Sequence, residues 1–435
     1  MDRKYLFLFG VARSGTTALA LIANTHPAVA IGMERFLELG KKGTLSPEHF
    51  TTEAFFDLPE GHDRRLNKSE RFRERFDEAT VVGDKIPHLT SGLAAIEERF
   101  PQPTFVAIVR DPTEVAHSWH RRALVPKGAW AEWMADTTSV AAQAAFWTAA
   151  LTEAPPERVM LVSYRTMLRD AASMRELVRR IAALVGIDDR CRERRIASLA
   201  RKSEMVRDRP RGLDAAGADF VRDNYYRPAL DFLDARGTAT IAEFPPELRA
   251  ETLAFYAARP HIELDALDNL AARGLGGPKL PARRAKLLAA TDRAEDAEAA
   301  LLAALAHDPS GKKYLHALAA HARSITGDKR AQNALAKLAR QRLQEGARDT
   351  ARQILALINV DNVKNERLAT FVERLRRLAA GEGNGAKPAG GREGKGRAGK
   401  GKARSGEERD GKSRGDRQGK GAAGAKRQRR DQPSA

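Results

Sequence analysis

Residues 7–17 read Phe-Leu-Phe-Gly-Val-Ala-Arg-Ser-Gly-Thr-Thr, and this stretch decides the predicted fold. The apolar run from Tyr5 to Phe9 has the length and aromatic content of a strand, and Thr16 to Asn24 has apolar residues at helical spacing. We expect a turn at Gly10. Strand, glycine loop and helix together predict a phosphate cradle, because unpaired N–H groups at a helix N-terminus point at an anion and the helix dipole favours negative charge.

The loop departs from that of the nucleoside triphosphatases. Gly10 and Gly15 keep the spacing of the Gly-x-x-x-x-Gly-Lys-[Ser/Thr] loop, but Thr16 stands at the lysine position and the positive charge is at Arg13. Cleavage of a triphosphate needs that lysine on the outer phosphates. The loop therefore predicts binding of one phosphate-like group beside a guanidinium. A plain strand-turn-helix corner is the alternative explanation of this stretch alone.

The composition predicts a basic protein with more than one domain. The chain has 435 residues and a formal charge of +18, and residues 381–435 hold 16 Lys/Arg against 7 Asp/Glu, which is half of the excess charge. The single cysteine, Cys191, excludes an intramolecular disulfide and suits a reducing compartment. We find no stretch of membrane-span length and no signal-peptide core, so we expect a cytoplasmic protein.

Strand-like and helix-like runs alternate along the first 275 residues. We expect strands at residues 5–9, 28–31, 80–83, 104–109 and 158–162, and helices at residues 16–24, 91–100, 138–153 and 173–186. This alternation predicts an α/β fold with a doubly wound parallel sheet and a P-loop-like phosphate-binding loop.

Polar residues follow the carboxyl end of each expected strand. In chain order they are Arg13, Glu34, Lys85, Arg110 and Tyr164. Ligands of open α/β sheets bind outside the carboxyl ends of the strands. Three cations and one acid at this edge predict a site for a molecule with several negative charges.

Two motifs then resemble a known family. The glycine loop, together with Val109-Arg-Asp-Pro-Thr-Glu-Val-Ala-His-Ser118, resembles the sulfotransferases that use 3′-phosphoadenosine 5′-phosphosulfate (PAPS). Gly83-Asp-Lys-Ile-Pro87 looks like the Lys-x-Pro segment of that family, and Met160-Leu-Val-Ser-Tyr-Arg165 is similar to its fifth-strand segment. The likeness covers roughly residues 1–270.

The resemblance implies roles for these residues. Arg110 and Ser118 would hold the 3′-phosphate, and Lys85 would approach the bridging oxygen and bind the donor. Arg13 and Lys85 would stabilise charge on the leaving oxygen. The remaining implied donor contacts are Arg13, Ser14, Gly15, Thr16 and Thr17 of the loop, with Tyr164. An ion pair with Asp111 or Glu114 is the alternative for Arg110. No cluster of His, Cys and carboxylates has metal-site spacing, so we predict no metal.

Transfer to a hydroxyl needs a base, and the sequence offers two. The stretch from Thr25 to Glu34 resembles the His-Pro…Gly-x-Glu segment of the protein-tyrosine sulfotransferases, whose glutamate is the base, so we predict Glu34. The alternative for Glu34 is a helix-starting glutamate. Phe36 stands where that family has arginine, so the likeness does not extend to sulfation of tyrosine. His88 is the rival base, and a turn residue is its alternative role.

The second half changes character. Residues 280–380 are rich in Ala, Leu, Arg and Glu at helical spacing and predict an α-helical module weakly similar to tetratricopeptide helix pairs, either for partner docking or as a bracket on the first domain. Residues 381–435 contain 15 glycines and no aromatics, which predicts a disordered basic tail. Such a tail suits weak binding of RNA, a membrane surface or an anionic glycan.

The sequence therefore predicts a PAPS-dependent sulfotransferase. Its acceptor would be a hydroxyl or amine on a carbohydrate, lipid or other metabolite, and nothing in residues 35–79, the expected acceptor wall, identifies it. Two other functions stay open. One is a P-loop nucleotide kinase or triphosphatase, and the other is a non-catalytic scaffold that binds partners through the helical module and the tail.

Overall fold

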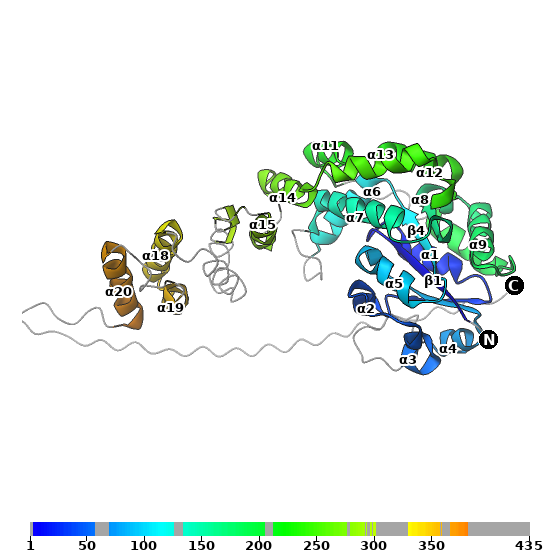
Figure 1. Cartoon of the computed structure of the whole chain (residues 1–435), viewed down its shortest axis with the longest axis horizontal. Helices are drawn as coiled ribbons and strands as arrows, with labels where there is room; N and C mark the ends of the chain where they lie inside the picture. Colours follow the sequence, from blue (N-terminus) through cyan, green and yellow to red (C-terminus); the bar gives the residue numbers. More distant parts are fainter. Residues whose placement is uncertain are drawn as a thin grey trace, which may run out of the picture. The chain divides into compact units, whose positions relative to one another are not determined.

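The computed structural model describes most of the first 275 residues and parts of the second half (Figure 1). The described residues are 3–56, 69–125, 134–204, 212–275, 279–291, 293, 296–297, 299–301, 329–356, 358 and 366–381. All the described residues belong to one unit, which spans residues 1–383. The predicted disordered tail lies outside the described residues except for Gly381.

A single six-stranded sheet organises this unit, in the order β2-β3-β1-β4-β5-β6. The strands are β1 (Lys4–Gly10), β2 (Val29–Met33), β3 (Val81–Lys85), β4 (Thr104–Val109), β5 (Val159–Ser163) and β6 (Thr238–Thr240). The first five strands pair in parallel, and their ends lie within two residues of the predicted ranges. The short β6 pairs antiparallel with β5 and was not predicted.

Alternate residues of β1 face two separate apolar layers. Leu6 and Leu8 pack with helices α1 (Thr16–Ala23), α9 (Ala171–Val185) and α10 (Glu193–Glu204). Phe7 and Phe9 pack on the other face. The helices of that face include α4 (Glu70–Glu78), α5 (Leu93–Arg99), α6 (Pro112–Ala123), α7 (Ser139–Thr152), α12 (Arg227–Arg236) and α13 (Pro246–Ala257). Helices on both faces of a mainly parallel sheet confirm the predicted doubly wound α/β fold.

Short helical segments and a group of phenylalanines cover the β2 side of the sheet. The segments are α2 (Leu37–Lys41), a 3₁₀ turn (Pro47–Phe50) and α3 (Thr52–Phe56). The rings of Phe36, Phe50 and Phe55 contact one another edge-on or tilted, with centroids 5.1–6.3 Å apart. Such pairs add to the burial of apolar area, so this cluster fixes the chain that leads from β2 toward β3.

Two helices that the sequence analysis did not predict, α11 (Ala215–Asp223) and α14 (Ile262–Ala272), complete the first 275 residues. In the predicted helical region that follows, the described helices are α15 (Lys279–Ala290), α18 (Lys329–Gln344), α19 (Arg348–Ala356) and α20 (Glu366–Ala380). Buried Leu335, Ile354 and Val372 join α18, α19 and α20 through one apolar cluster. The tetratricopeptide likeness and the domain limits 1–275 and 280–380 stay predictions.

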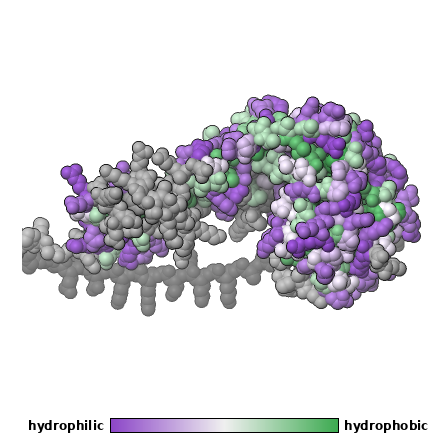
Figure 2. Space-filling model, viewed as in Figure 1, coloured by the Kyte–Doolittle hydropathy of each residue, from purple (hydrophilic) through white to green (hydrophobic). Residues whose placement is uncertain are grey.

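Hydrophilic residues cover much of the visible face of the sheet-containing part (Figure 2). Among the described residues, no helix combines the length and the apolar character needed to cross a membrane.

One glycine sets the spacing of the two strands that support the predicted site. A Cβ built on Gly83 of β3 would lie 1.7 Å from the carbonyl oxygen of Leu6 in β1, which is far inside van der Waals contact. We expect Gly83→Ala to lower the free energy of unfolding by about 2–3 kcal/mol or more, because the strands must separate. Urea denaturation measures this change. Gly212→Ala is the control, since its Cβ would lie an ordinary 3.4 Å from the His120 ring; equal losses in both variants would contradict the prediction.

Candidate functional site

The loop between β1 and α1 has the features of an anion cradle. Gly10 and Gly15 have φ angles of +148° and +107°, which favour glycine. A Cβ at Gly15 would lie 2.5 Å from the ring of Tyr164. Helix α1 begins with Thr16 and Thr17, and no side chain of the described residues caps it, so its first-turn N–H groups are available to an anion.

A serine hydroxyl in the same loop supports this interpretation. Ser14 Oγ is buried and has no hydrogen-bond partner in the part of the chain that the structure describes. A buried hydroxyl without a partner is costly, and a phosphate oxygen would satisfy it. The loop therefore fits a phosphate-like group, as the sequence predicts.

Two arginines from distant segments meet at this loop. The Arg110 guanidinium, at the end of β4, donates a 3.1 Å hydrogen bond to the carbonyl oxygen of Arg13. Arg13 Nε in turn donates to Ser118 Oγ of α6 over 3.0 Å. The structure thus brings together both arginines and the serine that the resemblance assigned to the two ends of the donor. Their roles stay predictions.

Arg110 also has the partner that the alternative reading expected. Its Nε bonds to Glu114 Oε2 at 2.8 Å, one helical turn along. The Glu114 side chain is 48 % exposed, so this pair is weak. On the other side, the Arg110 guanidinium lies 4.2 Å from the centroid of the Tyr164 ring. The ring and the Arg13 carbonyl therefore fix the guanidinium, and the ion pair does not exhaust its donors.

The predicted base and the predicted lysine form an ion pair. Lys85 Nζ lies 2.5 Å from Glu34 Oε1, and the two side chains are 2 % and 17 % exposed. The Glu34 N–H donates to the Lys85 carbonyl oxygen over 2.9 Å, which continues the β2–β3 ladder. Glu34 lies before α2 rather than inside it. It is therefore not the helix-starting glutamate that the alternative expected.

A buried carboxylate that we did not predict fixes this pair. Asp84, fully buried, accepts a 2.7 Å hydrogen bond from the N–H of Phe36 and a 2.9 Å bond from the N–H of Lys85. It thus ties the turn after Glu34 to β3. Burial raises the pKa of Asp84 to about 7, against the opposing effects of the N–H donors and the Lys85 charge.

His88, the rival base, has a structural contact. Its Nε2 accepts a hydrogen bond of 3.3 Å from the N–H of Ala12 in the loop. Burial, with a smaller effect of the Lys41 charge, lowers the pKa of His88 to about 4. The ring is therefore neutral near pH 7. The Nε2 lone pair that a base would use already accepts the hydrogen bond from the loop.

Backbone strain gathers at the same edge. Among the described residues, four that are not glycine have positive φ, and three of them are Arg13 (+72°), Glu34 (+60°) and His88 (+59°). Such conformations cost of the order of 1 kcal/mol or more each and are common where function requires a particular side-chain direction. This clustering is independent of the motifs and indicates the same site.

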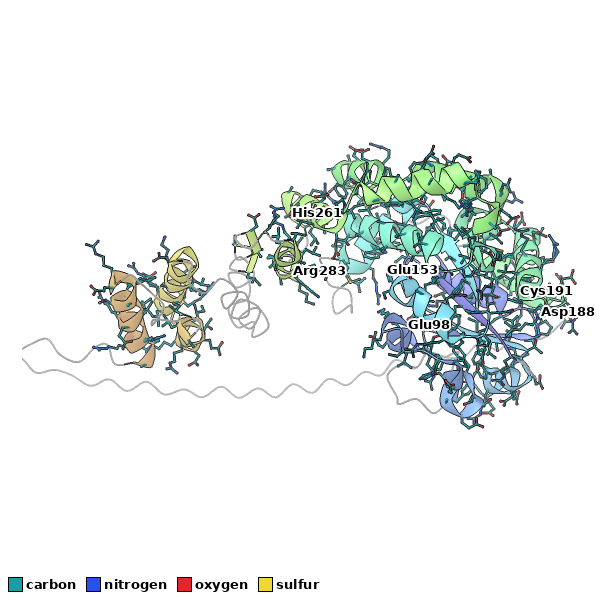
Figure 3. The ribbon with its side chains drawn as sticks, in the orientation of Figure 1. Glu98, Glu153, Asp188, Cys191, His261 and Arg283 are labelled. Atoms are coloured by element: carbon teal, nitrogen blue, oxygen red, sulfur yellow. The ribbon has the colours of Figure 1, made fainter. Side chains whose placement is uncertain are left out.

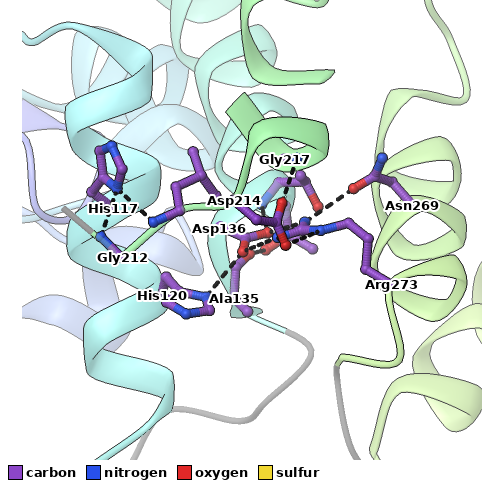
Figure 4. A network of polar contacts seen from close by, with 12 residues as sticks. His117, His120, Ala135, Asp136, Gly212, Asp214, Gly217, Asn269 and Arg273 are labelled. Carbon is purple, nitrogen blue, oxygen red and sulfur yellow. Dashed lines mark hydrogen bonds and ion pairs between the residues drawn. The ribbon is translucent and has the colours of Figure 1, made fainter. Parts of the chain in front are cut away.

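Helix α6 is held by polar contacts that the sequence did not reveal. Trp119 Nε1 donates to the Ala12 carbonyl oxygen at 2.7 Å, and His117 Nδ1 accepts from the N–H groups of Gly212 and Leu213. His120 bonds to Asp136, which is fully buried (Figure 4).

An arginine completes this network from α14. Arg273 bonds to both carboxylate oxygens of Asp136 at 2.9 Å and to Asp214, which caps α11 through the N–H of Gly217 (Figure 4). The network therefore holds the helix that carries Ser118 against two later segments of the chain. Among the described residues, no group of three or more His, Cys, Asp or Glu side chains is arranged to bind a metal ion.

Several solved structures whose titles describe sulfotransferases resemble this chain. One is a sulfotransferase from Alicyclobacillus acidocaldarius, with 15 % identity over 62 % of this chain and 96 % of that chain and a TM-score of 0.30. The sulfotransferase domain from the curacin biosynthetic pathway has 14 % identity over 59 % and 97 %, with a TM-score of 0.33. Mouse sulfotransferase SULT7A1 complexed with PAP has 15 % identity over 61 % and 88 %, with a TM-score of 0.27. No curated protein matches the chain.

The family comparison covers the segments that build the site. Residues 6–190 match the model of the sulfotransferase family. The match includes the loop at Arg13, the Glu34–Lys85 pair, and Arg110 with Ser118. The resemblance that the sequence motifs indicated is therefore confirmed, and residues 6–190 of this chain carry the pattern of the sulfotransferase family.

Proposed function

We propose that this protein transfers a sulfuryl group from PAPS to a hydroxyl or amine acceptor on a carbohydrate, lipid or other metabolite. The observation that carries the proposal is the meeting of Arg13, Arg110 and Ser118 beside the glycine loop. Guanidinium forks bind phosphate oxygens in pairs, and a hydroxyl adds a neutral donor. These groups suit a nucleotide that carries negative charge at both ends.

The residues fit the donor at two places. The uncapped N–H groups of α1 and the buried hydroxyl of Ser14 would hold the 5′-phosphosulfate. Arg110 and Ser118 would hold the 3′-phosphate, with Tyr164 against the guanidinium. When bound, the donor supplies a sulfuryl group already activated on a phosphate.

Two cations stabilise the charge that develops during in-line transfer. Lys85 has a side chain only 2 % exposed, so its charge is poorly screened by water and acts strongly on a nearby oxygen. Arg13 lies in the loop itself and adds a second positive charge. With these two cations, the proposed transfer uses no metal ion. That the reaction is independent of metal stays a prediction.

Glu34 acts as the general base and takes the proton of the acceptor hydroxyl. In the resting site Lys85 neutralises its carboxylate. As Lys85 turns toward the leaving oxygen, the carboxylate of Glu34 is released to accept a hydrogen bond from the acceptor hydroxyl. His88 is less suited, because the N–H of Ala12 occupies its Nε2 lone pair.

Arg110→Ala tests the binding of the donor. We expect it to weaken binding of 3′,5′-adenosine bisphosphate roughly 10- to 100-fold, the value of a lost charge-assisted hydrogen bond. Calorimetry without magnesium measures this affinity. Arg122→Ala, on the exposed last turn of α6, removes the same charge and leaves the affinity unchanged. Absence of nucleotide binding by the unaltered protein, or magnesium-dependent turnover of ATP, would reject the proposed function.

Glu34→Gln tests the base. We expect the rate of transfer of radioactive sulfur from the donor to an acceptor pool from a cell extract to fall by about 10²–10⁴, because proton removal loses its catalyst. The affinity for 3′,5′-adenosine bisphosphate should stay within about twofold, because in the proposed mechanism Glu34 makes no bond to the nucleotide. Glu38→Gln, more than half exposed on α2, is the matched control. A larger loss in His88→Gln than in Glu34→Gln would reassign the base.

Asp84 positions the base and should make stability depend on pH. Its raised pKa means that the stability it contributes is present at low pH and is lost as the pH rises through about 7. Between pH 5 and pH 8, Asp84→Asn should therefore lose less stability than the unaltered protein, by on the order of 2–3 kcal/mol. Urea denaturation at both pH values measures the difference. Equal pH dependence in the two proteins would contradict it.

A further inference from the structure

The opposite end of helix α1 carries a second concentration of positive charge. The glycine loop precedes the N-terminus of α1, whereas the helix ends at Ala23, about 12 Å away, with Asn24 as its C-cap. Four arginines from two other elements gather near this end: Arg71, Arg75, Arg192 and Arg195. None of them contributes to the site described above.

Arg75 is the innermost of the four. Its side chain, on α4, donates to the carbonyl oxygen of Asn24 at 3.0 Å and to Asn24 Oδ1 at 2.7 Å. The side-chain amide of Asn24 is itself fixed by two 2.9 Å hydrogen bonds to the backbone of Ile31 in β2. Arg75 is 7 % exposed, and its buried Nε has no partner within the described residues. This cation is therefore placed rigidly at the corner.

The segment before α10 and the first turn of α10 bring two more arginines toward the same corner. The N–H of Arg192 donates to the carbonyl oxygen of Thr25 over 3.0 Å, next to the residue that receives Arg75. Arg195 follows one helical turn after Arg192, and Arg71 precedes Arg75 by one turn on α4. Figure 3 shows Asp188 and Cys191 in this segment, beside the C-terminal end of α9.

The arginines repel one another without an acid to balance them. Burial lowers the pKa of Arg75 to about 10, and the charges of Arg192, Arg195 and Arg71 add to the shift. Burial with the charges of Arg192 and Arg71 also lowers the pKa of Arg195. No carboxylate among the described residues forms an ion pair with any of the four.

Two acids near the start of α10 pair with other arginines. Asp188 pairs with Arg190 at 2.7 Å, and Glu193 pairs with Arg175 at 3.1 Å. Like charges held together in a partly buried corner destabilise the fold unless an anion joins them. The side chain of Arg75 is explained by its bonds to the end of α1, but the convergence of the other three on it is not.

We propose that Arg71, Arg75, Arg192 and Arg195 form a second oxyanion site, separate from the candidate active site, that takes one sulfate or phosphate group. Guanidinium forks from two helices match the oxygens of a tetrahedral anion, and arginine suits this role because it keeps its charge when partly buried. The group is either a free ion or a substituent of a sulfated saccharide. This proposal does not depend on the sulfotransferase reaction.

The test is thermal unfolding of the full chain at constant ionic strength, with sodium sulfate replacing sodium chloride. At a sulfate concentration about ten times the dissociation constant of the site, Tm should rise by roughly 2–4 °C. The double variant Arg71→Ala with Arg195→Ala should lose this shift. In chloride alone the double variant should be at least as stable as the unaltered protein, because mutual repulsion is relieved, and this separates loss of the site from failure to fold.

The control removes equal charge elsewhere. Arg179 and Arg222 are exposed and paired with acids of their own helices, so Arg179→Ala with Arg222→Ala should keep the full sulfate shift. Both variants keep the glycine loop and experience the same general stabilising effect of sulfate. Those two contributions to the Tm shift are therefore equal and drop out of the comparison. An equal shift in the Arg71/Arg195 variant and the control would overturn the proposal.

A heparin-derived tetrasaccharide distinguishes the two sources of the anion. A Tm shift with both probes that depends on Arg71 and Arg195 supports recognition of the oxyanion itself. A shift with the tetrasaccharide alone, lost in the same variant, supports a site for sulfated sugar. If neither probe distinguishes the variant from the control, the four arginines do not form an anion site.

Discussion

The candidate site depends on one hydrogen bond, from the guanidinium of Arg110 to the backbone of Arg13. Two cations that approach each other should repel. Here the repulsion is limited, because Arg110 meets a carbonyl oxygen, a tyrosine ring and a partly exposed glutamate. The β4 end and the glycine loop thereby keep a fixed distance. A nucleotide would meet a prepared pair of charges, and preorganisation of this kind reduces the cost of binding.

The other half of the site uses the same principle with opposite charges. Lys85 and Glu34 neutralise each other in a region almost closed to water, where an unpaired charge is costly. Asp84 holds the backbone on both sides of this pair. The positive φ angles of Arg13, Glu34 and His88 show that the surrounding structure, and not local preference, determines where these side chains point.

Much of this arrangement follows from the sequence. The carboxyl ends of parallel strands lie at one edge, so Arg13, Glu34, Lys85 and Arg110 could be placed together once the five strands were recognised. Asp84 was not predicted because its partners are backbone N–H groups, and one of them belongs to Phe36 in the segment after β2. Contacts with backbone groups produce no recognisable sequence motif. The bond from Trp119 to the loop escaped for the same reason. Strand β6 spans three residues, too few for a periodic signal.

That short strand has a consequence for the behaviour of the molecule in concentrated solution. Without Thr238–Thr240, the backbone of β5 would present a row of unsatisfied donors and acceptors to any neighbouring chain. The three residues of β6 pair antiparallel with that row. Their own outer edge has few backbone groups left for another strand to bond. The sheet is thereby protected on this side from fibril-like stacking, with a stretch of chain too small to attract a strand from another molecule.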